Sequence, residues 1–456
     1  MKRITVGDPR LGQRMRELRR TRGLTQEALA KGIHIKDDKL SRFEQGKQLP
    51  TSHELRDFAD TLRLGPELWR DLKRLWDQAQ EPDVVRRLAL GQHPERVFAE
   101  LYPFVYAADT PLTHTYEKMS ETTAAFAEAY AGLRNKRVLD MGCGYGTTTV
   151  ALAAFGPSEI VAVDMSSPMI ELLRQVLLSS DPLDAFLRRR GAEAVLDEFY
   201  EPTLAHLHWI RTTFQGSLFW RPPQQGALRA LVWDGLQLEQ AHIAPVDVVV
   251  ANNYLHWPVN QRMNQLQQVY PDRSSAELLA QASRDALHPL AALLPPKGIA
   301  VITETKDFVT VDQCPDLDTD RSPDLDAAME RHFPTVHPLF LTFQETVNRL
   351  LKEEYGIERD IPQTTKLFET STLPALVRNG GFALRRVHVV EHTCPCDPLD
   401  SYFVRLPMLL GTIDIPLQAK IDLAKRVRRE LGKTPFHEIL QNPLRIFWFF
   451  LVLERM

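Results

Sequence analysis

A short glycine-rich segment holds the first group of residues in this chain that could bind a ligand. An apolar run ends at Asp140, and three glycines follow at alternate positions: Gly142, Gly144 and Gly146. Glycine permits a tight turn and lets a ligand approach the backbone without a Cβ in the way. A helix-forming run begins at Thr147, and the N–H groups of a first helical turn would point at that ligand. The segment therefore predicts a ligand-binding loop between a strand and a helix.

Further polar residues follow other apolar runs. Asp164 ends the β-branched run 160–163, about 20 positions beyond the glycines, where a carboxylate can accept hydrogen bonds from both hydroxyls of a ribose. Asp234 and Gly235 follow a third run, and Asn252 ends a fourth. Ligands of open α/β sheets bind at the carboxyl ends of the strands. We therefore expect these residues to meet at one edge of a sheet.

The glycine spacing separates two families of nucleotide-binding proteins. The pattern D-x-G-x-G-x-G differs from the dinucleotide fingerprint G-x-G-x-x-G. It resembles motif I of the Rossmann-like (class I) S-adenosylmethionine (SAM) methyltransferases, and residues 294–298 resemble the turn before the fifth strand of that family. The resemblance extends over roughly residues 100–456. It implies an α/β fold, a Rossmann-like seven-stranded methyltransferase sheet with helical insertions.

Apolar runs supply the strands that such a sheet requires. The expected strands are 138–140, 160–163, 230–233, 246–251, 299–303, 384–391 and 445–453. The resemblance also implies the cofactor, SAM, with S-adenosyl-L-homocysteine as product. By position in the family motifs, the cofactor-binding residues are Asp140, Gly142, Gly144 and Gly146 near the methionine part, Asp164 at the ribose, Met165, Asp234 and Gly235 at the adenine, and Asn252 beneath the amino group. Asp234 could instead be a plain turn residue before its glycine.

His256 is the candidate catalytic residue. It follows the fourth expected strand, and histidine can take up a proton near neutral pH. The pattern N-x-x-L-H-W at 252–257 resembles small-molecule carboxyl methyltransferases of the trans-aconitate and malonyl-carrier-protein kind, in which this segment lines the pocket. The alternative is a structural histidine packed beside Trp257.

The first eighty residues form a different module. From Leu11 onward, apolar residues recur at helical spacing. The stretches L-T-Q-E-A-L-A at 24–30 and L-S-R-F-E-Q-G at 40–46, with Pro50, resemble the helix-turn-helix of the Cro/phage-repressor type, the Xre family. Helices at 51–63 and 66–79 would complete a small all-α domain.

In that family the second helix of the motif, here about 36–44, enters the major groove of DNA. The DNA-binding residues carried over by position are Gln26, Lys36, Asp37, Lys39 and Arg42. Residues 1–80 hold 18 basic and 12 acidic side chains, so they carry +6 and the rest of the chain carries −10. This difference in charge is consistent with a basic DNA-binding module joined to an acidic enzyme domain. Repressor-type modules often bind paired half-sites as dimers, so a homodimer is one expectation.

The module departs from its family at two places. His34 replaces the expected turn glycine, and Asp37 and Asp38 begin the reading helix, where carboxylates repel phosphates unless one accepts a hydrogen bond from a cytosine amine. The alternative to DNA binding is a module that serves dimerisation or protein contact.

The domain boundaries follow from these motifs. We expect a helix-turn-helix domain at 1–80, a helical linker and cofactor-capping segment at 81–135, and a methyltransferase domain at 136–456. The 70 residues between Asp164 and Asp234 exceed a single crossover, which indicates an insertion. The expected insertions are about 178–225, 258–290 and 398–440.

Composition excludes several classes. The 456 residues are 44% hydrophobic and 25% charged, as in an ordinary soluble protein. The start lacks the apolar core of a secretion signal, and the late apolar run 446–453 is too short to span a bilayer. Four cysteines make no disulfide framework. We expect a cytoplasmic protein, with no membrane partner, from a bacterial or archaeal source.

A metal site is not expected either. His388, His392, Cys394 and Cys396 lie along one expected strand, and no second ligand pair stands at finger spacing. Ordinary core and edge residues are the better interpretation of the four.

Three functions compete. The first is a SAM-dependent methyltransferase that acts on a small-molecule acceptor, by O- or N-methylation, tethered to a DNA-binding module. The second is a transcriptional regulator whose methyltransferase-like domain senses SAM or a metabolite without catalysis. The third, a DNA base methyltransferase, is disfavoured because 252–254 read N-N-Y without the prolines of N-P-P-Y, and because Pro395 and Cys396 come too late for a cytosine nucleophile.

Overall fold

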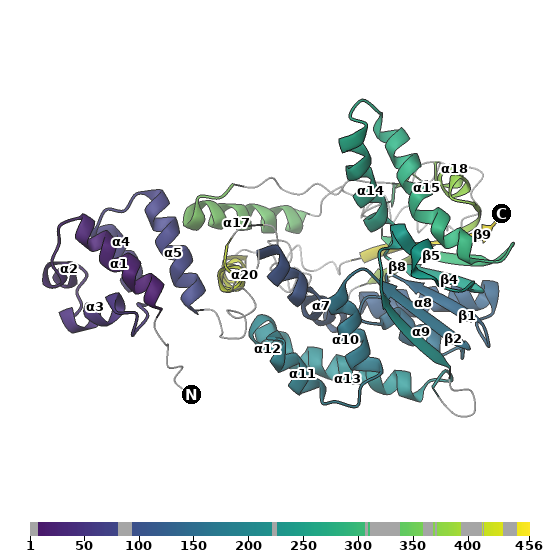
Figure 1. Cartoon of the computed structure of the whole chain (residues 1–456), viewed down its shortest axis with the longest axis horizontal. Coiled ribbons are helices and arrows are strands. Elements are labelled where there is room, and N and C mark those ends of the chain that lie inside the picture. The colour runs from purple at the N-terminus through teal and green to yellow at the C-terminus, as the bar shows by residue number, and fades with distance from the viewer. Residues whose placement is uncertain are drawn as a thin grey trace. The chain divides into compact units, whose positions relative to one another are not determined.

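The chain forms two units. The computed structural model describes residues 8–80, 94–220, 226–305, 309–310, 338–358, 368–369, 372–393, 413, 415–431 and 445–456. Contacts divide the chain into a helical unit (1–98, 338–361 and 405–436) and a sheet unit (99–337, 362–404 and 437–456). Figure 1 shows the helices and strands of each.

The sheet unit is built on one seven-stranded sheet with the order β3-β2-β1-β4-β5-β9-β8. Its strands are β1 (Arg137–Met141), β2 (Glu159–Asp164), β3 (Ala227–Val232), β4 (Val248–Asn252), β5 (Ile299–Thr305), β8 (Phe382–Thr393) and β9 (Arg445–Arg455). The first five are parallel, and β9 is antiparallel to β5 and to β8. The α/β fold with a seven-stranded sheet is confirmed. A separate short pair, β6 (Val309–Thr310) and β7 (Phe368–Glu369), follows β5 and precedes β8.

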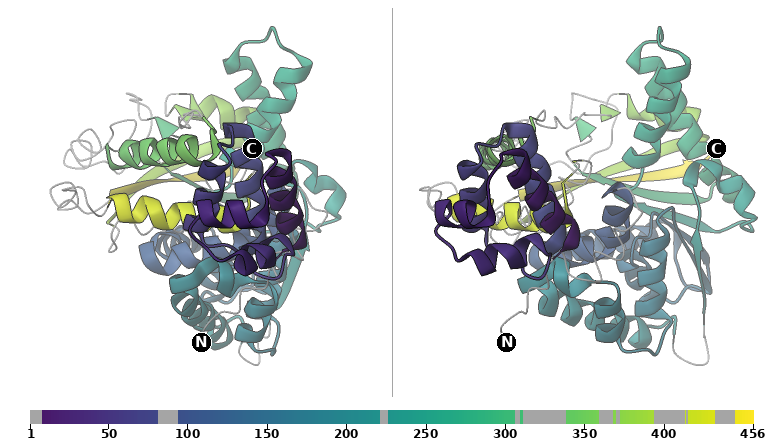
Figure 2. Two further views of the ribbon diagram at one scale, coloured as in Figure 1. Left: turned by 90° about the vertical axis from the view of Figure 1, so that its left-hand side faces the viewer. Right: turned by 60° about the vertical axis from the view of Figure 1, so that its left-hand side comes forward.

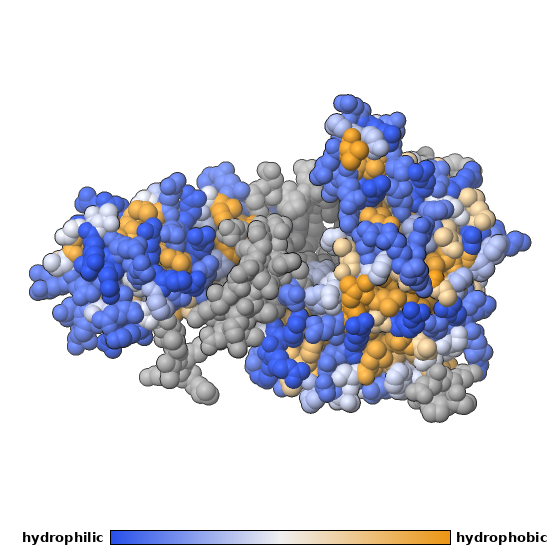
Figure 3. Space-filling view, viewed as in Figure 1, coloured by the Kyte–Doolittle hydropathy of each residue, from blue (hydrophilic) through white to orange (hydrophobic). Residues whose placement is uncertain are grey.

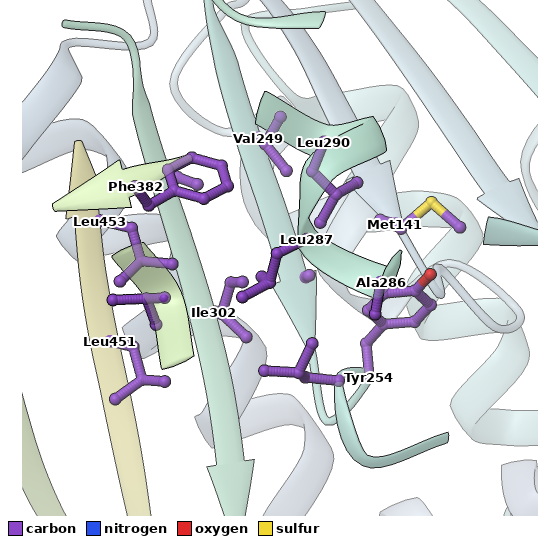
Figure 4. Close-up of a cluster of buried hydrophobic side chains, with 14 of the residues drawn as sticks. Met141, Val249, Tyr254, Ala286, Leu287, Leu290, Ile302, Phe382, Leu451 and Leu453 are labelled. Carbon is purple, nitrogen blue, oxygen red and sulfur yellow. The ribbon is translucent and has the colours of Figure 1, made fainter. Parts of the chain in front are cut away.

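The central strands are buried on both faces, which explains their continuous apolar sequences. All five residues of β4 are buried, as are the middle five of β5. On one face the side chains of β1, β4, β5 and β9 pack against the helices α14 (His256–Val269) and α15 (Ser275–Leu293), and Figure 4 shows part of this core around Leu287 and Ile302.

Helices cover the sheet and fill the long connections. The others in this unit are α7 (Pro94–Thr113, which starts ahead of the unit boundary), α8 (Thr115–Ala131), α9 (Thr147–Ala153), α10 (Ser167–Leu177), α11 (Leu183–Arg189), α12 (Ala192–Leu196), α13 (Tyr200–Gly216) and α18 (Leu373–Asn379). Helices α11 to α13 lie between β2 and β3, in the stretch expected to be a helical insertion. A capping box of Ser274 and Glu277 starts α15, because each side chain binds the other residue's backbone N–H.

The helical unit contains the five helices expected at the start of the chain. They are α1 (Pro9–Thr21), α2 (Gln26–Gly32), α3 (Asp37–Glu44), α4 (Ser52–Thr61) and α5 (Pro66–Gln80), shown from two further sides in Figure 2. Asp8 caps α1, Thr25 caps α2, and Thr51 forms a capping box with Glu54 at α4. Leu40, Phe43 and Phe58 are among the buried side chains that hold the bundle together.

Two further helices of the helical unit come from late in the chain. They are α17 (Pro338–Tyr355) and α20 (Leu417–Leu431), and both pack in this unit rather than on the sheet. The Tyr355 hydroxyl donates to Asp77 Oδ2 on α5 at 2.9 Å. Both helices lie within residues 136–456, the stretch expected from the sequence to form one domain, and the expected domain boundaries stay predictions. Of the helices that the structure describes, none is both long and apolar enough to cross a membrane.

Candidate functional site

The glycine loop after β1 leaves one stretch of backbone open. All three glycines have positive φ values, 70° at Gly142, 53° at Gly144 and 104° at Gly146. A Cβ at Gly142 would lie 2.7 Å from the Tyr254 ring, whereas a Cβ at Gly144 would have no atom within 4 Å. Gly142 is therefore needed by internal packing, and Gly144 presents bare backbone to open space.

Asp164 at the end of β2 fastens this loop. Its carboxylate accepts hydrogen bonds from the backbone N–H of Gly144 at 3.0 Å and of Ser166 at 2.8 Å. Burial raises the pKa of Asp164, against the lowering effect of these two N–H donors. The following side chain, Met165, is 59% exposed, which leaves an apolar surface beside the acid. Asp164 therefore lies directly beside the glycine loop.

Asp140 lies fully buried beneath the loop. Its Oδ2 accepts a hydrogen bond from the Thr149 hydroxyl at 2.6 Å, while its buried Oδ1 has no partner. Burial raises the pKa of Asp140 to about 7, against the lowering effect of Thr149, and the charge of Asp164 raises it further. A cation placed at the loop would favour the ionised form of this carboxyl.

The remaining expected cofactor residues are held by protein atoms. Asp234 Oδ1 accepts from the Leu236 N–H at 2.9 Å, so it caps the short helix that begins at Gly235. A Cβ at Gly235 would lie 1.8 Å from the Tyr254 hydroxyl oxygen. That buried hydroxyl has no partner.

Asn252 joins the sheet to α8. Its amide nitrogen donates to the hydroxyls of Ser120 and Thr148, each at 3.1 Å, and its oxygen accepts from Thr123 at 3.3 Å. Four side chains that the sequence analysis did not single out belong to this buried network: Ser120, Thr123, Thr148 and Thr303. No local signal identifies them, because isolated serines and threonines are common on helices and strands.

His256 opens α14 and is held by a residue that sequence reasoning missed. Its Nδ1 lies 2.8 Å from Glu304 Oε2, and its backbone N–H donates to Glu304 Oε1 at 3.1 Å. Glu304 is fully buried near the end of β5. The side chain of Trp257, next to His256 in the chain, is 61% exposed, and the ring centroids of His256 and Trp257 are 5.3 Å apart. A carboxylate at the end of an apolar strand was the available signal for Glu304.

Tyr145, within the glycine loop, links that loop to two helices. Its hydroxyl donates to Thr110 of α7 at 2.7 Å and lies 3.1 Å from His206 Nε2 of α13. Glu117 of α8 in turn lies 2.9 Å from His206 Nδ1. The loop is therefore supported by the helices around it.

The expected DNA-reading surface lies on α2 and α3, and several of its side chains are paired within the unit. Gln26 donates to Glu44 at 2.8 Å, Lys39 pairs with Glu54, and Arg42 lies 3.0 Å from Asp38. Lys36 and Asp37 are exposed at the start of α3. Figure 3 shows that this unit is mainly hydrophilic on the face in view.

His34 reproduces the missing turn glycine in backbone conformation. It adopts φ 56°, in the left-handed region that glycine favours. The turn before α3 is therefore made in spite of the substitution.

The four residues weighed for zinc are placed only in part. His388 stacks on Phe126 at 4.2 Å, and His392 stacks on Trp448 at 5.2 Å. Cys394 and Cys396 lie outside the described residues. Within the part of the chain that the structure describes, no three metal-ligating side chains gather.

The protein is therefore built on a Rossmann-like sheet, with a glycine-rich loop after its first strand and acidic residues at the ends of strands. Residues 112–384 match the profile of the methyltransferase-domain family, so the chain belongs to this methyltransferase family. Residues 10–72 match the profile of a helix-turn-helix domain.

Three known proteins show how far the likeness extends. A demethylmenaquinone methyltransferase from Lactiplantibacillus plantarum is 39% identical over 59 residues, which are 12% of this chain and 25% of that protein. The chain thus spans about a quarter of that relative. The uncharacterized HTH-type transcriptional regulator YazB from Bacillus subtilis is 36% identical over 56 residues, 12% of this chain and 81% of YazB. The crystal structure of the YcgJ protein from Bacillus subtilis is 13% identical with a TM-score of 0.30, covering 73% of this chain and 97% of that one.

Proposed function

We propose that the chain is a SAM-dependent methyltransferase for a small-molecule acceptor, methylated on oxygen or nitrogen, tethered to a DNA-binding helix-turn-helix. The proposal of SAM as the cofactor rests on two observations: the open backbone at Gly144 and the buried Asp140 oxygen that has no hydrogen-bond partner. A bare backbone admits a ligand closely, and a carboxylate oxygen without a hydrogen-bond partner favours a nearby cation. A sulfonium nucleoside fits both.

The residues of the candidate site would then have defined roles in binding SAM. Asp164 would accept from the ribose hydroxyls while it continues to hold the Gly144 N–H. Met165 would cover the adenine, and Asp140 would face the positive end of the ligand. Asp234, Gly235, Gly142 and Asn252 would shape the pocket through the contacts described above. Gly146 would do so through its positive φ value. SAM supplies a methyl group on an activated leaving group, so the protein contributes mainly by positioning.

His256 would remove the proton of the acceptor. Glu304 holds Nδ1 of the ring and the backbone N–H of the same residue, which fixes the ring orientation. A histidine ring fixed in this way can accept a proton from a hydroxyl or an N–H group. The exposed indole of Trp257 would offer an apolar face to the same acceptor.

The cofactor site is tested at Asp164. Asp164→Ala should weaken SAM binding about 10- to 100-fold, because a hydrogen bond to a charged group contributes about 1.5–3 kcal/mol. Titration calorimetry with SAM and with S-adenosyl-L-homocysteine measures the effect. Asp247→Ala is the matched control, since Asp247 also accepts a backbone N–H, that of Arg137 at 2.8 Å, but does so at the opposite edge of the sheet. Equal dissociation constants for the wild type and Asp164→Ala would show that Asp164 does not bind the cofactor.

The proposed DNA partner is bound through the helical unit. Lys36 stands exposed at the start of α3, so it is placed to contact a phosphate. Lys36→Gln should reduce the slope of log affinity against log salt by about 0.9, the value for one lost phosphate contact. Fluorescence anisotropy with DNA from upstream of its own coding region checks this, with Lys118→Gln on α8 as the control. An unchanged slope would remove Lys36 from the interface.

A further inference from the structure

The helical unit is assembled from three separate stretches of the chain. It takes residues 1–98, then 338–361, then 405–436, so the chain passes between the two units five times. A module appended at the N-terminus would need one passage. The other four bring α17 and α20 into the helical unit and return the chain to the sheet.

The strands that precede or follow these four passages in the chain are β5, β8 and β9. The end of β5, the end of β8 and the start of β9 lie at the same end of the sheet. Strand β5 ends at Thr305, and the stretch that follows leads to α17. The chain returns at β7, which pairs with β6 directly after β5. Helix α20 lies between the end of β8 and the start of β9, and Thr393 pairs there with Arg445.

That end of the sheet is the one at which the candidate cofactor site lies. In the parallel part of the sheet, Asn252 at the end of β4 pairs with Thr303 of β5. Glu304, the residue that holds His256, comes next on β5 and pairs with Phe449 of β9. Of the strands that carry the site, β5 is the one whose end leads on toward α17, while β9, its neighbour in the sheet, follows α20 in the chain.

Within the helical unit, contacts lead from α17 to the reading helix. Tyr355 of α17 donates to Asp77 of α5, and Lys73 lies 2.5 Å from Asp77 Oδ1. The indole N–H of Trp76, one residue before Asp77, donates to the Pro50 carbonyl at 2.7 Å. Pro50 lies between α3 and α4, a few residues after the reading helix ends. Asp77 is fully buried, so its donors matter for the stability of this packing.

We propose that the methyltransferase site has a second function: occupation of the site by its ligands changes the affinity of the helical unit for DNA. This inference rests on the proposed function. A ligand shifts a protein's conformations only by its differential affinity for them, and here the site includes Glu304 at the end of β5, the strand from which the chain leads on to α17 of the helical unit. By linkage, DNA changes the affinity for the ligand by the same factor.

The experiment uses the full chain and the unreactive product S-adenosyl-L-homocysteine. Anisotropy with a labelled duplex from upstream of its own coding region gives the DNA dissociation constant without and with saturating ligand, at one salt concentration. We expect a change of between about 5- and 150-fold, the usual range for coupled sites. Calorimetry in the same buffer establishes saturation. Bound ligand with an unchanged DNA affinity would overturn the inference alone, whereas absence of ligand binding would overturn the proposed function with it.

A variant tests the path through α5. Tyr355→Phe removes the hydroxyl that donates to Asp77 and keeps the ring. We expect methyl transfer and ligand-free DNA binding near the wild-type values, with a ligand-induced change in DNA affinity at least threefold smaller, in line with weaker coupling. Tyr270→Phe, at the exposed end of α14, is the control and should leave the change intact. A full-sized change in Tyr355→Phe would show that α17 does not carry the coupling.

Discussion

His256→Asn should lower the turnover number of methyl transfer by about a hundredfold to ten-thousandfold, the usual contribution of a positioned general base. Asparagine keeps a polar side chain at the first turn of α14 but cannot take up a proton. The affinity for SAM should stay within about twofold, because the ring is fastened to Glu304 rather than to the glycine loop. Initial rates with labelled SAM and calorimetry on the same preparation separate the two effects.

Two further variants show whether the ring acts chemically. Glu304→Gln keeps an acceptor oxygen near the ring but removes the carboxylate, so the rate should fall less than in His256→Asn. His288→Asn, an exposed histidine on α15, should have no effect. Full turnover by His256→Asn would assign the histidine a structural role, the alternative that the sequence left open.

Glu44→Gln should destabilise the helical unit by about 3–5 kcal/mol, the usual cost of removing one partner from a buried ion pair. Arg19 donates to both Glu44 oxygens, at 2.5 and 2.9 Å, and the two side chains are 9% and 0% exposed. Gln26 donates to the same carboxylate. The substitution leaves the Arg19 charge without its counter-ion in a dry environment. Urea unfolding followed by circular dichroism measures the loss.

An exposed pair in the same helix provides the comparison. Asp38→Asn breaks the contact between Asp38 and Arg42, whose side chains are 64% and 52% exposed. Water and salt screen such a pair, so the unfolding free energy should change by less than about 1 kcal/mol. If the two substitutions had equal effects, the buried pair would not be what stabilises the bundle.

The strands, the helices and the polar residues at the strand ends could be predicted from local patterns of amino acids. The expected strands correspond to the observed ones, with shifts at their ends: β3 begins at Ala227 rather than at 230, and β4 begins at Val248 rather than at 246. Burial on both faces requires continuous apolar runs, and a ligand-binding turn requires glycine, so both features can be recognised locally. The capped helices of the first eighty residues follow from similarly local signals.

Contacts between side chains far apart in the chain could not be predicted in this way. Glu304 lies 48 positions from His256, and Tyr355 lies 278 positions from Asp77. Neither pairing has a local signature, because each depends on how strands align and on which helix packs beside which. The same holds for Asn252, whose amide is bound by hydroxyls of α8 and α9, and for Gly235, whose missing side chain makes room for Tyr254. A sequence pattern reflects interactions between residues that are close in the chain, whereas tertiary packing determines which distant residues come into contact.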